Sequence, residues 1–189
     1  MDFYNDPSKV AEYIQMCDEY DGSNLYEILE ASLKQSSSLL ELGSGPGNDL
    51  EYLSKNFQVT GSDLSDEFIK RNKETHPSIS FFKLDAVNIE IDKTFDCLFS
   101  NKVLHHLTKE KLEQSLQRQT QVITNKGLFA HTFWLADKEF EMEGMLFVFY
   151  DKDELIQMVS KYFTIEKLYE YDEFEANDSL FILARNDKN

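Results

Sequence analysis

Three glycines within five residues follow a short apolar run and form the most distinctive motif of the chain. They lie in LLELGSGPGNDLEYL, residues 39–53, with the spacing GxGxG at Gly43, Gly45 and Gly47. A glycine-rich turn between a strand and a helix lets the backbone approach a cofactor closely. A dinucleotide fingerprint, GxGxxG, would need glycine at Asn48, and the proline in the turn removes an N–H that a pyrophosphate could use. The motif therefore disfavours a diphosphate.

Acidic residues end the next two predicted strands. Asp63 closes FQVTGSD, and a carboxylate at this place can accept hydrogen bonds from both hydroxyls of a ribose. Asp85 follows the next strand in LDA, where its carboxylate could bind the exocyclic amine of adenine while the backbone of Ala86 contacts a ring nitrogen. Alone, Asp63 could be a simple cap, but with the glycines it predicts an adenosine site.

Histidines follow the fourth predicted strand in SNKVLHHL. His105 and His106 are candidates to accept a proton from a nucleophile, although packing or loop orientation would also explain them. We expect Lys102 to be solvated and His131, inside a strand, to be buried and hydrogen-bonded. His, Cys and carboxylates do not cluster at metal-ligand spacing, so we expect no metal.

Helical and strand patterns alternate along the chain. Apolar spacing predicts helices at about 7–20, 24–35, 47–55, 65–76, 108–124 and 152–161. The predicted strands are SLLEL, FQVTGSD, ISFFKLDA, FDCLFSN, GLFAHTFW, FTIEKLYEY and SLFILAR, the last two forming an antiparallel hairpin. This order predicts a parallel sheet wound on both faces, with ligands bound at the carboxyl edge of its strands.

Local signals predict several helix ends. Ser65 and Thr108 are expected N-caps, and Pro77 should end a helix near His76. The helix that begins at Thr108 should end at Asn125-Lys126-Gly127. Its apolar stripe comprises Leu112, Leu116 and Ile123.

The composition indicates a globular chain whose negative charge disfavours binding to polyanions. Its 189 residues, 41% apolar, suffice for one domain with a core, and the net charge of −16 disfavours nucleic acid and membrane partners. The apolar run at 145–150 is too short to span a bilayer. Cys17 and Cys97 form no CxxC, and the start of the chain lacks a signal-peptide pattern, so we expect reduced thiols and a cytoplasmic protein.

Taken in order, these motifs resemble the class I S-adenosylmethionine-dependent methyltransferases, and most closely the small stand-alone members that act on small molecules. The resemblance covers roughly residues 36–186 and rests on ELGSGPG, GSDLS, LDA, FDCLFSNKVLHHL and KGLFAHTFW. It implies an α/β, Rossmann-like, doubly wound seven-stranded sheet in a single domain, mostly parallel with the last strand antiparallel.

The resemblance also implies roles for particular residues. The loop would pass beneath the methionine part of S-adenosylmethionine, with Glu41 near its ammonium group, and Asn101 would lie beside the sulfonium. Asp63 would bind the ribose, with Leu64 against the adenine face. The implied cofactor-binding set is Glu41, Gly43, Ser44, Gly45, Gly47, Asp63, Leu64, Asp85, Ala86 and Asn101.

Residues 1–189 are expected to form one methyltransferase domain. Residues 1–35 would cover the active site, 36–134 would bind the cofactor, 135–150 would form a lid, and 151–189 would add the closing helix and hairpin. Candidate substrate contacts from the cover and the lid are Tyr13, Tyr20, Trp134, Met145 and Tyr150, whereas Phe147 and Phe149 are expected to belong to the core.

The leading hypothesis is an enzyme that methylates an O, N, S or C atom of a small molecule and releases S-adenosylhomocysteine. The alternative is a non-catalytic protein that binds S-adenosylmethionine or S-adenosylhomocysteine. The glycine spacing opposes an NAD-dependent oxidoreductase, and the charge of −16 opposes a nucleic-acid methyltransferase and favours neutral or cationic acceptors.

Overall fold

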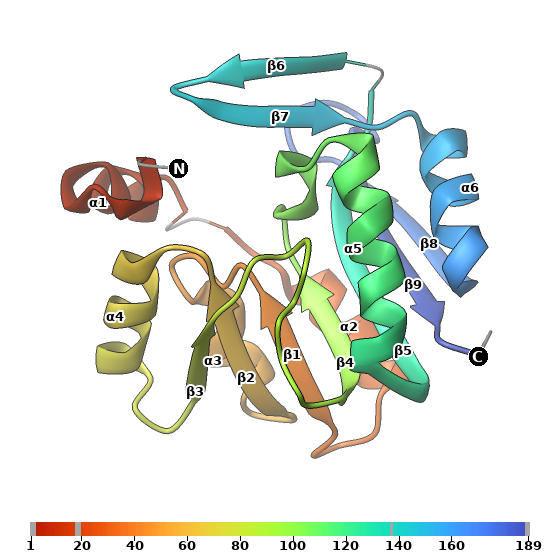
Figure 1. Ribbon diagram of the computed structural model, residues 1–189, viewed down its shortest axis with the longest axis horizontal. Coiled ribbons are helices and arrows are strands. Elements are labelled where there is room, and N and C mark those ends of the chain that lie inside the picture. Colours follow the sequence, from red (N-terminus) through yellow and green to blue (C-terminus); the bar gives the residue numbers. More distant parts are fainter. Residues whose placement is uncertain (1–2, 18–19, 137, 188–189) are drawn as a thin grey trace.

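A central sheet of seven strands organises the computed structural model, which describes residues 3–17, 20–136 and 138–187 (Figure 1). In chain order its strands are β1 (Ser38–Leu42), β2 (Gln58–Asp63), β3 (Ser80–Lys83), β4 (Phe95–Ser100), β5 (Ile123–Trp134), β8 (Thr164–Tyr171) and β9 (Ser179–Arg185). The helices are α1 (Pro7–Met16), α2 (Ser23–Ser32), α3 (Asn48–Leu53), α4 (Asp66–Thr75), α5 (Lys109–Val122) and α6 (Lys152–Tyr162). Two short 3₁₀ helices are η1 (Phe3–Asn5) and η2 (Leu104–His106).

The strand order is β3-β2-β1-β4-β5-β9-β8. Strands β1 to β5 pair in parallel, whereas β9 is antiparallel to both β5 and β8. This arrangement confirms the predicted fold, including the antiparallel last strand and the closing hairpin. The chain proceeds from β1 to one side through β2 and β3 and then crosses to β4 on the other side of β1. Such a reversal places a ligand site at the carboxyl ends of β1 and β4.

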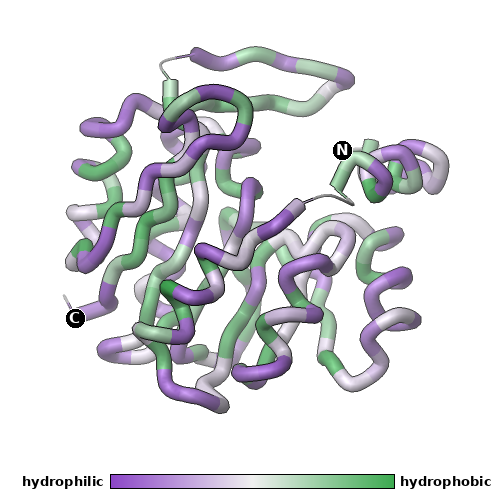
Figure 2. Tube along the Cα trace, turned by 180° about the vertical axis from the view of Figure 1, so that it is seen from behind, coloured by the Kyte–Doolittle hydropathy of each residue, from purple (hydrophilic) through white to green (hydrophobic). Residues whose placement is uncertain are grey.

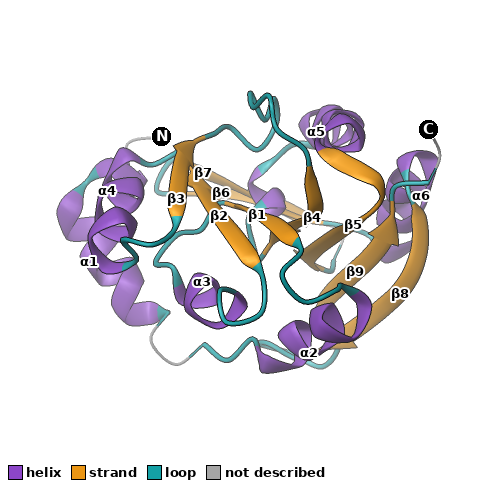
Figure 3. Ribbon diagram, turned by 90° about the horizontal axis from the view of Figure 1, so that it is seen from below, coloured by secondary structure: helices purple, strands orange, loops and turns teal. Residues whose placement is uncertain are grey.

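Helices cover both faces of the sheet: α5 and α6 lie on one side and α2 and α3 on the other (Figure 3). Leu39 of β1 packs with residues of α2 and α3, whereas Leu40 and Leu42 pack with residues of α5 and α6. Successive side chains of a strand point to opposite faces, so a strand between two helical layers needs apolar residues on both. This requirement explains the apolar run SLLEL.

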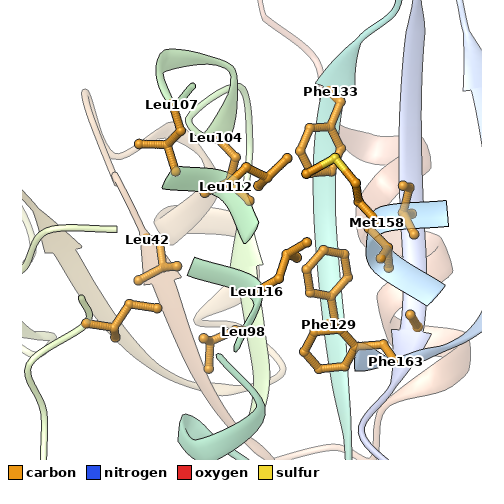
Figure 4. Packing of buried hydrophobic residues seen from close by; sticks show 14 of the residues in the cluster. Leu42, Leu98, Leu104, Leu107, Leu112, Leu116, Phe129, Phe133, Met158 and Phe163 are labelled. Atoms are coloured by element: carbon orange, nitrogen blue, oxygen red, sulfur yellow. The ribbon is translucent and has the colours of Figure 1, made fainter. Parts of the chain in front are cut away.

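The larger part of the core lies between the sheet and the helices α5 and α6 (Figure 4). Leu112 and Leu116, four residues apart on α5, are fully buried there, as the helical spacing predicts. Labelled residues that share this core include Leu42, Leu98, Phe129, Phe133, Met158 and Phe163.

The predicted end of α5 is wrong. The helix ends at Val122, Ile123 belongs to β5, and Asn125-Lys126-Gly127 lie within that strand. Val122, Ile123 and Thr124 are all β-branched, which favours extended backbone. Two backbone hydrogen bonds hold the segment in the sheet: Lys126 N–H donates to the Asn186 carbonyl at 2.8 Å, and Asn186 N–H donates to the Gly127 carbonyl at 3.0 Å.

Other predicted helix ends agree with the structure. The side chains of Ser65 and Thr108 cap α4 and α5, and His76 ends α4. The helix predicted at 7–20 is observed as Pro7–Met16, and residues 18 and 19 lie outside the described residues.

A separate two-stranded sheet projects beyond the carboxyl edge of the main sheet. It consists of β6 (Lys138–Met142) and β7 (Met145–Phe149), which form a hairpin above η2, and α1 lies beyond the same edge (Figure 1). Apolar residues concentrate in β7, while β6 alternates between apolar and charged residues and is exposed throughout (Figure 2). Within the described part of the chain, no helix combines the length and apolar character needed to cross a membrane.

Candidate active site

The loop between β1 and α3 depends on its three glycines. Gly43, Gly45 and Gly47 have φ values of 67°, 48° and 92°, in the left-handed region that residues with a Cβ rarely adopt. A Cβ on Gly43 would lie 2.6 Å from a methyl of Val103, so the loop approaches the segment after β4 closely. A Cβ on Gly45 would project into open space. The loop therefore presents bare backbone at the carboxyl edge.

Hydrogen bonds link this loop to β2. The Gly45 N–H donates to Asp63 Oδ2 at 2.9 Å. Ser44 Oγ accepts from the Ser62 N–H at 3.0 Å and donates to the Ser62 carbonyl at 3.1 Å. Ser44 is buried and its side chain is used for this link, so it positions the loop.

Asp63 lies at the end of β2, directly beside the glycine loop. Its second oxygen, Oδ1, accepts from the Ser65 N–H at 2.8 Å, so both oxygens are oriented by backbone groups. Burial raises the pKa of Asp63, whereas these backbone donors act in the opposite direction. Leu64, the next residue, is 46% exposed and offers an apolar surface next to the carboxylate.

Two buried carboxylates lie beneath the loop. Glu41 on β1 is 1% exposed, and among the described residues its Oε2 has no hydrogen-bond partner. Asp49, in the first turn of α3, accepts from the hydroxyl of Tyr26 at 2.6 Å. Burial, with the nearby charges of Asp49 and Asp63, raises the pKa of Glu41 well above its usual value, and burial also raises the pKa of Asp49. A bound cation would compensate the negative charge of both carboxylates.

Asn101, which follows β4, joins this cluster. Its Nδ2 donates to the Tyr20 hydroxyl at 2.7 Å and to both carboxylate oxygens of Asp49 at 3.3 Å, and its Oδ1 accepts from Thr132 Oγ1 at 3.0 Å. The structure therefore brings together Glu41, Asp49, Asn101 and Tyr20.

Asp85 and Ala86 follow β3 on the other side of the loop. Asp85 is exposed, and its Oδ1 accepts from the Val87 N–H at 2.8 Å. The Ala86 carbonyl accepts from Ser115 Oγ at 2.6 Å, which ties the turn to α5. The backbone bond from Leu84 N to the Asp63 carbonyl, 3.0 Å long, links this turn to the end of β2.

His105 and His106 lie in η2, just beyond β4. The ring of His105 is 2% exposed and stacks on Trp134 at 4.2 Å and on Phe147 at 5.6 Å between ring centroids. Burial, with the nearby His106 and Lys102, lowers the pKa of His105 well below its usual value, so its ring is neutral. His106 Nδ1 lies 2.7 Å from the Leu146 carbonyl, and burial lowers its pKa although that carbonyl opposes the shift.

Comparison with known proteins finds similarity to methyltransferases. Residues 39–127 match a family model described as a methyltransferase domain. An uncharacterized methyltransferase of Alkaliphilus oremlandii is 30% identical over 152 residues, which are 79% of this chain and 65% of that protein. The chain therefore contains a methyltransferase domain, as its ordered motifs predict. A putative methyltransferase 235L of Invertebrate iridescent virus 6 is 31% identical over 74 residues, or 38% of this chain and 28% of that one. The chain thus spans less than two thirds of the length of either relative.

Solved methyltransferases share its fold at low sequence identity. The 1,6-didemethyltoxoflavin-N1-methyltransferase of Burkholderia thailandensis, solved with 1,6-didemethyltoxoflavin and S-adenosylhomocysteine, has a TM-score of 0.77 and 20% identity, covering 94% of this chain and 86% of that one. The N-methyltransferase NodS of Bradyrhizobium japonicum, solved with S-adenosylhomocysteine, has a TM-score of 0.74 and 16% identity, covering 98% and 99%. A TehB-like methyltransferase of Corynebacterium glutamicum has a TM-score of 0.77 and 18% identity, covering 96% and 100%.

Lys102 is not the solvated side chain that the sequence suggested. Only 12% of the side chain is exposed, and its Nζ forms an ion pair with Glu173 at 2.6 Å. It also donates to Ser179 Oγ at 2.8 Å and lies 5.3 Å from the centre of the Trp134 ring. The expectation failed because the segment between β8 and β9 supplies Glu173. Burial lowers the pKa of Lys102, and Glu173 opposes that shift.

The predicted substrate residues divide between the carboxyl edge and the core. Trp134, at the end of β5, donates from Nε1 to Glu173 at 2.9 Å, and Tyr20 lies beside Asn101. Tyr150 is fully buried in the core, where its hydroxyl donates to the Leu107 carbonyl at 2.8 Å. Tyr20 therefore lies near the glycine loop and Trp134 lies near η2, whereas Tyr150 is enclosed in the core.

Tyr13 and Met145 lie on the two elements beyond the edge. Tyr13 of α1 packs with Tyr4 at 5.3 Å and Phe68 at 6.0 Å between ring centroids, on the side of α4. Met145 begins β7 and is 4% exposed. Phe147, expected to be core, is 8% exposed within the aromatic contacts of His105 and Trp134.

His131 confirms the prediction of a buried, hydrogen-bonded histidine. It is fully buried, with Nδ1 2.6 Å from Ser100 Oγ and Nε2 2.9 Å from Gln119 Oε1. Burial lowers its pKa to about 3. The ring therefore serves the packing of β4, β5 and α5.

Sequence reasoning missed Asp49 and Glu173. Asp49 follows the third glycine by two residues, and an acid in the first turn of a helix is usually explained by the helix dipole. Its burial, 8% exposed, is what distinguishes it. No local signal marks Glu173, which meets Lys102 only in the folded chain.

Proposed function

We propose that this chain is an S-adenosylmethionine-dependent methyltransferase that acts on a small molecule. The observation that carries the proposal is the buried Glu41 Oε2, which has no partner among the described residues and lies beneath a loop of bare backbone. An unpaired carboxylate in such a place is costly, and an ammonium group would compensate it. The methionine end of this cofactor carries that group.

The remaining residues of the edge suit the rest of the cofactor. Asp63 has both oxygens oriented by backbone donors and retains lone pairs for the ribose hydroxyls. Leu64 would contact the adenine face, with Asp85 and Ala86 at its polar edge. Gly43, Ser44, Gly45 and Gly47 would shape the loop, and Asn101 would lie near the sulfonium. No phosphate is present in this cofactor, which agrees with the GxGxG spacing and with the acidic surroundings.

When bound, S-adenosylmethionine supplies an electrophilic methyl group, which bonds to the acceptor's lone pair as the carbon–sulfur bond breaks and its electrons remain on sulfur. The protein's part is to orient the acceptor and exclude water. We propose that residues 1–35 and the hairpin within 135–150 cover the site as parts of one domain. An ion pair of 3.1 Å between Lys9 of α1 and Glu143 at the hairpin turn supports this arrangement.

His105 and His106 are proposed to serve the acceptor. A neutral imidazole can take a proton from a nucleophile that must lose one, and the lowered pKa of His105 keeps its ring neutral. His106 is held by the Leu146 carbonyl and would position the hairpin against η2. Neither residue is needed as a base when the acceptor carries no proton on the reacting atom.

Binding and turnover test the proposal separately. Calorimetry should detect binding of S-adenosylmethionine and no binding of NAD. Incubation with S-adenosylmethionine and a panel of small acceptors should release S-adenosylhomocysteine. Failure to bind S-adenosylmethionine would refute the proposal. Tight binding with no product from any acceptor would favour a non-catalytic binding protein.

A further inference from the structure

Five nearly parallel rings gather beyond the carboxyl edge of the sheet. They come from η2, the end of β5 and the hairpin, and we refer to them as the ring stack: His105, Trp134, Phe140, Phe147 and Phe149. The planes of neighbouring rings differ by 30° for His105 and Trp134, 17° for His105 and Phe147, and 13° for Phe140 and Phe147. Elements distant in sequence thus present rings of one common orientation.

His105 is the polar member of the ring stack, and neither of its nitrogens has a hydrogen-bond partner among the described residues. The ring is 2% exposed. His131 offers a contrast within the same protein, because its equally buried ring has a partner on each nitrogen. A buried polar group without a partner is rare in folded proteins and calls for a ligand or an ordered water. His105 therefore marks a place where a bound molecule would supply hydrogen bonds.

The orientation of His105 defines the shape of that molecule. Hydrogen bonds to imidazole nitrogens lie in the plane of the ring. That plane is within 17° of Phe147 and 30° of Trp134, so a flat partner that bonds to His105 and keeps to the plane of its ring lies nearly parallel to both rings. From this geometry we infer that the methyl acceptor is an uncharged, planar heteroaromatic ring whose edge nitrogen, N–H or carbonyl bonds to His105. This inference rests on the proposed function.

The surrounding charges explain why the acceptor should be uncharged. Lys102, whose Nζ lies 5.3 Å from the centre of the Trp134 ring, already pairs with Glu173 at 2.6 Å. An anionic ring would therefore meet a cation that is already paired, beside the carboxylate of Glu173. A cationic ring would lie close to Lys102. An uncharged ring avoids both costs and still stacks on Trp134.

The hairpin can admit such a ring. Its strands pair with each other and not with the main sheet, and a two-stranded sheet is marginally stable alone. Among the described residues, backbone hydrogen bonds of 3.0 Å at its base join Ala136 N to the Tyr150 carbonyl and Tyr150 N to the Trp134 carbonyl, and the His106 side chain bonds to the Leu146 carbonyl. Displacement of the hairpin would separate Phe147 from His105 and Trp134 and open the edge of the His105 ring, where a flat acceptor would bond in the plane of that ring.

Trp134 provides the measurement, because it is the single tryptophan of the chain. We would titrate the full chain, with and without S-adenosylhomocysteine, with quinazolin-4-one, a flat uncharged ring with an N–H and a carbonyl at its edge. Calorimetry gives the affinity, and Trp134 fluorescence, corrected for the probe's absorbance, gives the place of binding. Cyclohexanecarboxamide supplies an amide without a flat ring, and naphthalene-2-sulfonate supplies a flat ring with a negative charge.

We expect quinazolin-4-one to change Trp134 fluorescence saturably and to bind at least about tenfold more tightly than either control. The variant His105→Phe, which keeps a ring for stacking but no nitrogens, should weaken that binding about tenfold, equivalent to about 1.4 kcal/mol. His105→Gln should restore part of it. Equal binding of the three probes, or binding unaffected in His105→Phe, would overturn the inference.

The inference and the proposed function fail in different ways. S-adenosylmethionine that binds while quinazolin-4-one does not would overturn the inference and leave the proposed function standing. Absence of S-adenosylmethionine binding would overturn the proposed function and with it the role of the ring as acceptor. Affinity for S-adenosylmethionine also reports whether the His105 variants are folded, and the comparison of the three probes on the unaltered protein decides the question if they are not.

Discussion

Replacement of Glu41 by Gln should raise the free energy of unfolding of the protein and, at the same time, weaken its binding of the cofactor. Glu41 is 1% exposed, and its Oε2 has no partner among the described residues. Burial and the charges of Asp49 and Asp63 raise its pKa. The folded protein therefore retains a proton on Glu41 at pH values where the unfolded chain has lost it, and stability falls as pH rises through this window, beginning near the usual value of 4.5.

The magnitudes follow from these contacts. An uncompensated buried acceptor costs about 1–3 kcal/mol. The free energy of unfolding of Glu41→Gln should therefore exceed that of the unaltered protein by about 1 kcal/mol at pH 8 and differ little near pH 4. A hydrogen bond to a charged group contributes about 1.5–3 kcal/mol. Loss of the carboxylate should therefore weaken S-adenosylmethionine binding roughly tenfold to hundredfold.

Urea unfolding from pH 4 to 8 gives the first quantity, and calorimetry with S-adenosylmethionine gives the second. Calorimetry of the unaltered protein in buffers of different ionisation enthalpy should also show proton release on binding, and the variant should lose that release. Glu51→Gln is the matched control, since it removes the same charge from an exposed position on α3. A Glu41→Gln protein that binds the cofactor as tightly as Glu51→Gln does would refute the assignment of Glu41 to the ammonium group.

Three further predictions concern the loop and the core. Asp63→Ala removes the acceptor for Gly45 N–H and the proposed ribose contact, so the Kd for S-adenosylmethionine should rise at least about tenfold by calorimetry; unchanged affinity would contradict this role. Gly47→Ala should lower the free energy of unfolding by about 1–3 kcal/mol in urea, because φ is 92° and the new Cβ would lie 2.7 Å from Asn72 Oδ1; an unchanged midpoint would count against it. His131, with its pKa lowered to about 3, should stay neutral above about pH 4 by NMR. Because the unfolded chain takes up that proton below about pH 6.5, the contribution of His131 to stability should fall by about 2 kcal/mol between pH 8 and 5; a ring that titrates near 6 would contradict its burial.

The sheet and the glycine loop were predictable because their signals are local. The run SLLEL, the spacing of Gly43, Gly45 and Gly47 and the position of Asp63 all lie within a short stretch. Strand alternation then places the ends of β1 and β2 side by side, and the observed bond from Gly45 N–H to Asp63 follows from that adjacency. Sequence spacing alone was enough because the parallel topology leaves few arrangements.

The remaining features depend on contacts between distant segments. Lys102 looks solvated in its own neighbourhood, yet Glu173, Ser179 and Trp134 contact it in the folded chain. The C-terminal end of α5 was misplaced because the hydrogen bonds that hold Lys126 and Gly127 in β5 come from Asn186. Tyr150 adjoins the hairpin in sequence, yet its hydroxyl bonds to Leu107 in the core. Neither the spacing of apolar residues nor the residue types of turns identifies partners that are distant in the sequence.

The two halves of the proposed site differ in how they are held, and this difference bears on what each can recognise. The cofactor side is fixed by backbone donors between neighbouring strands, as at Gly45 and Asp63, so its geometry is set by the sheet. The acceptor side depends on ring contacts between η2, β5 and a hairpin that has no strand partner in the main sheet. Ring stacking tolerates sliding and replacement of one ring by another, whereas directional bonds to His105 do not. Affinity for the cofactor should therefore be insensitive to changes in the hairpin, and selection among flat acceptors should depend on the edge that each presents to His105.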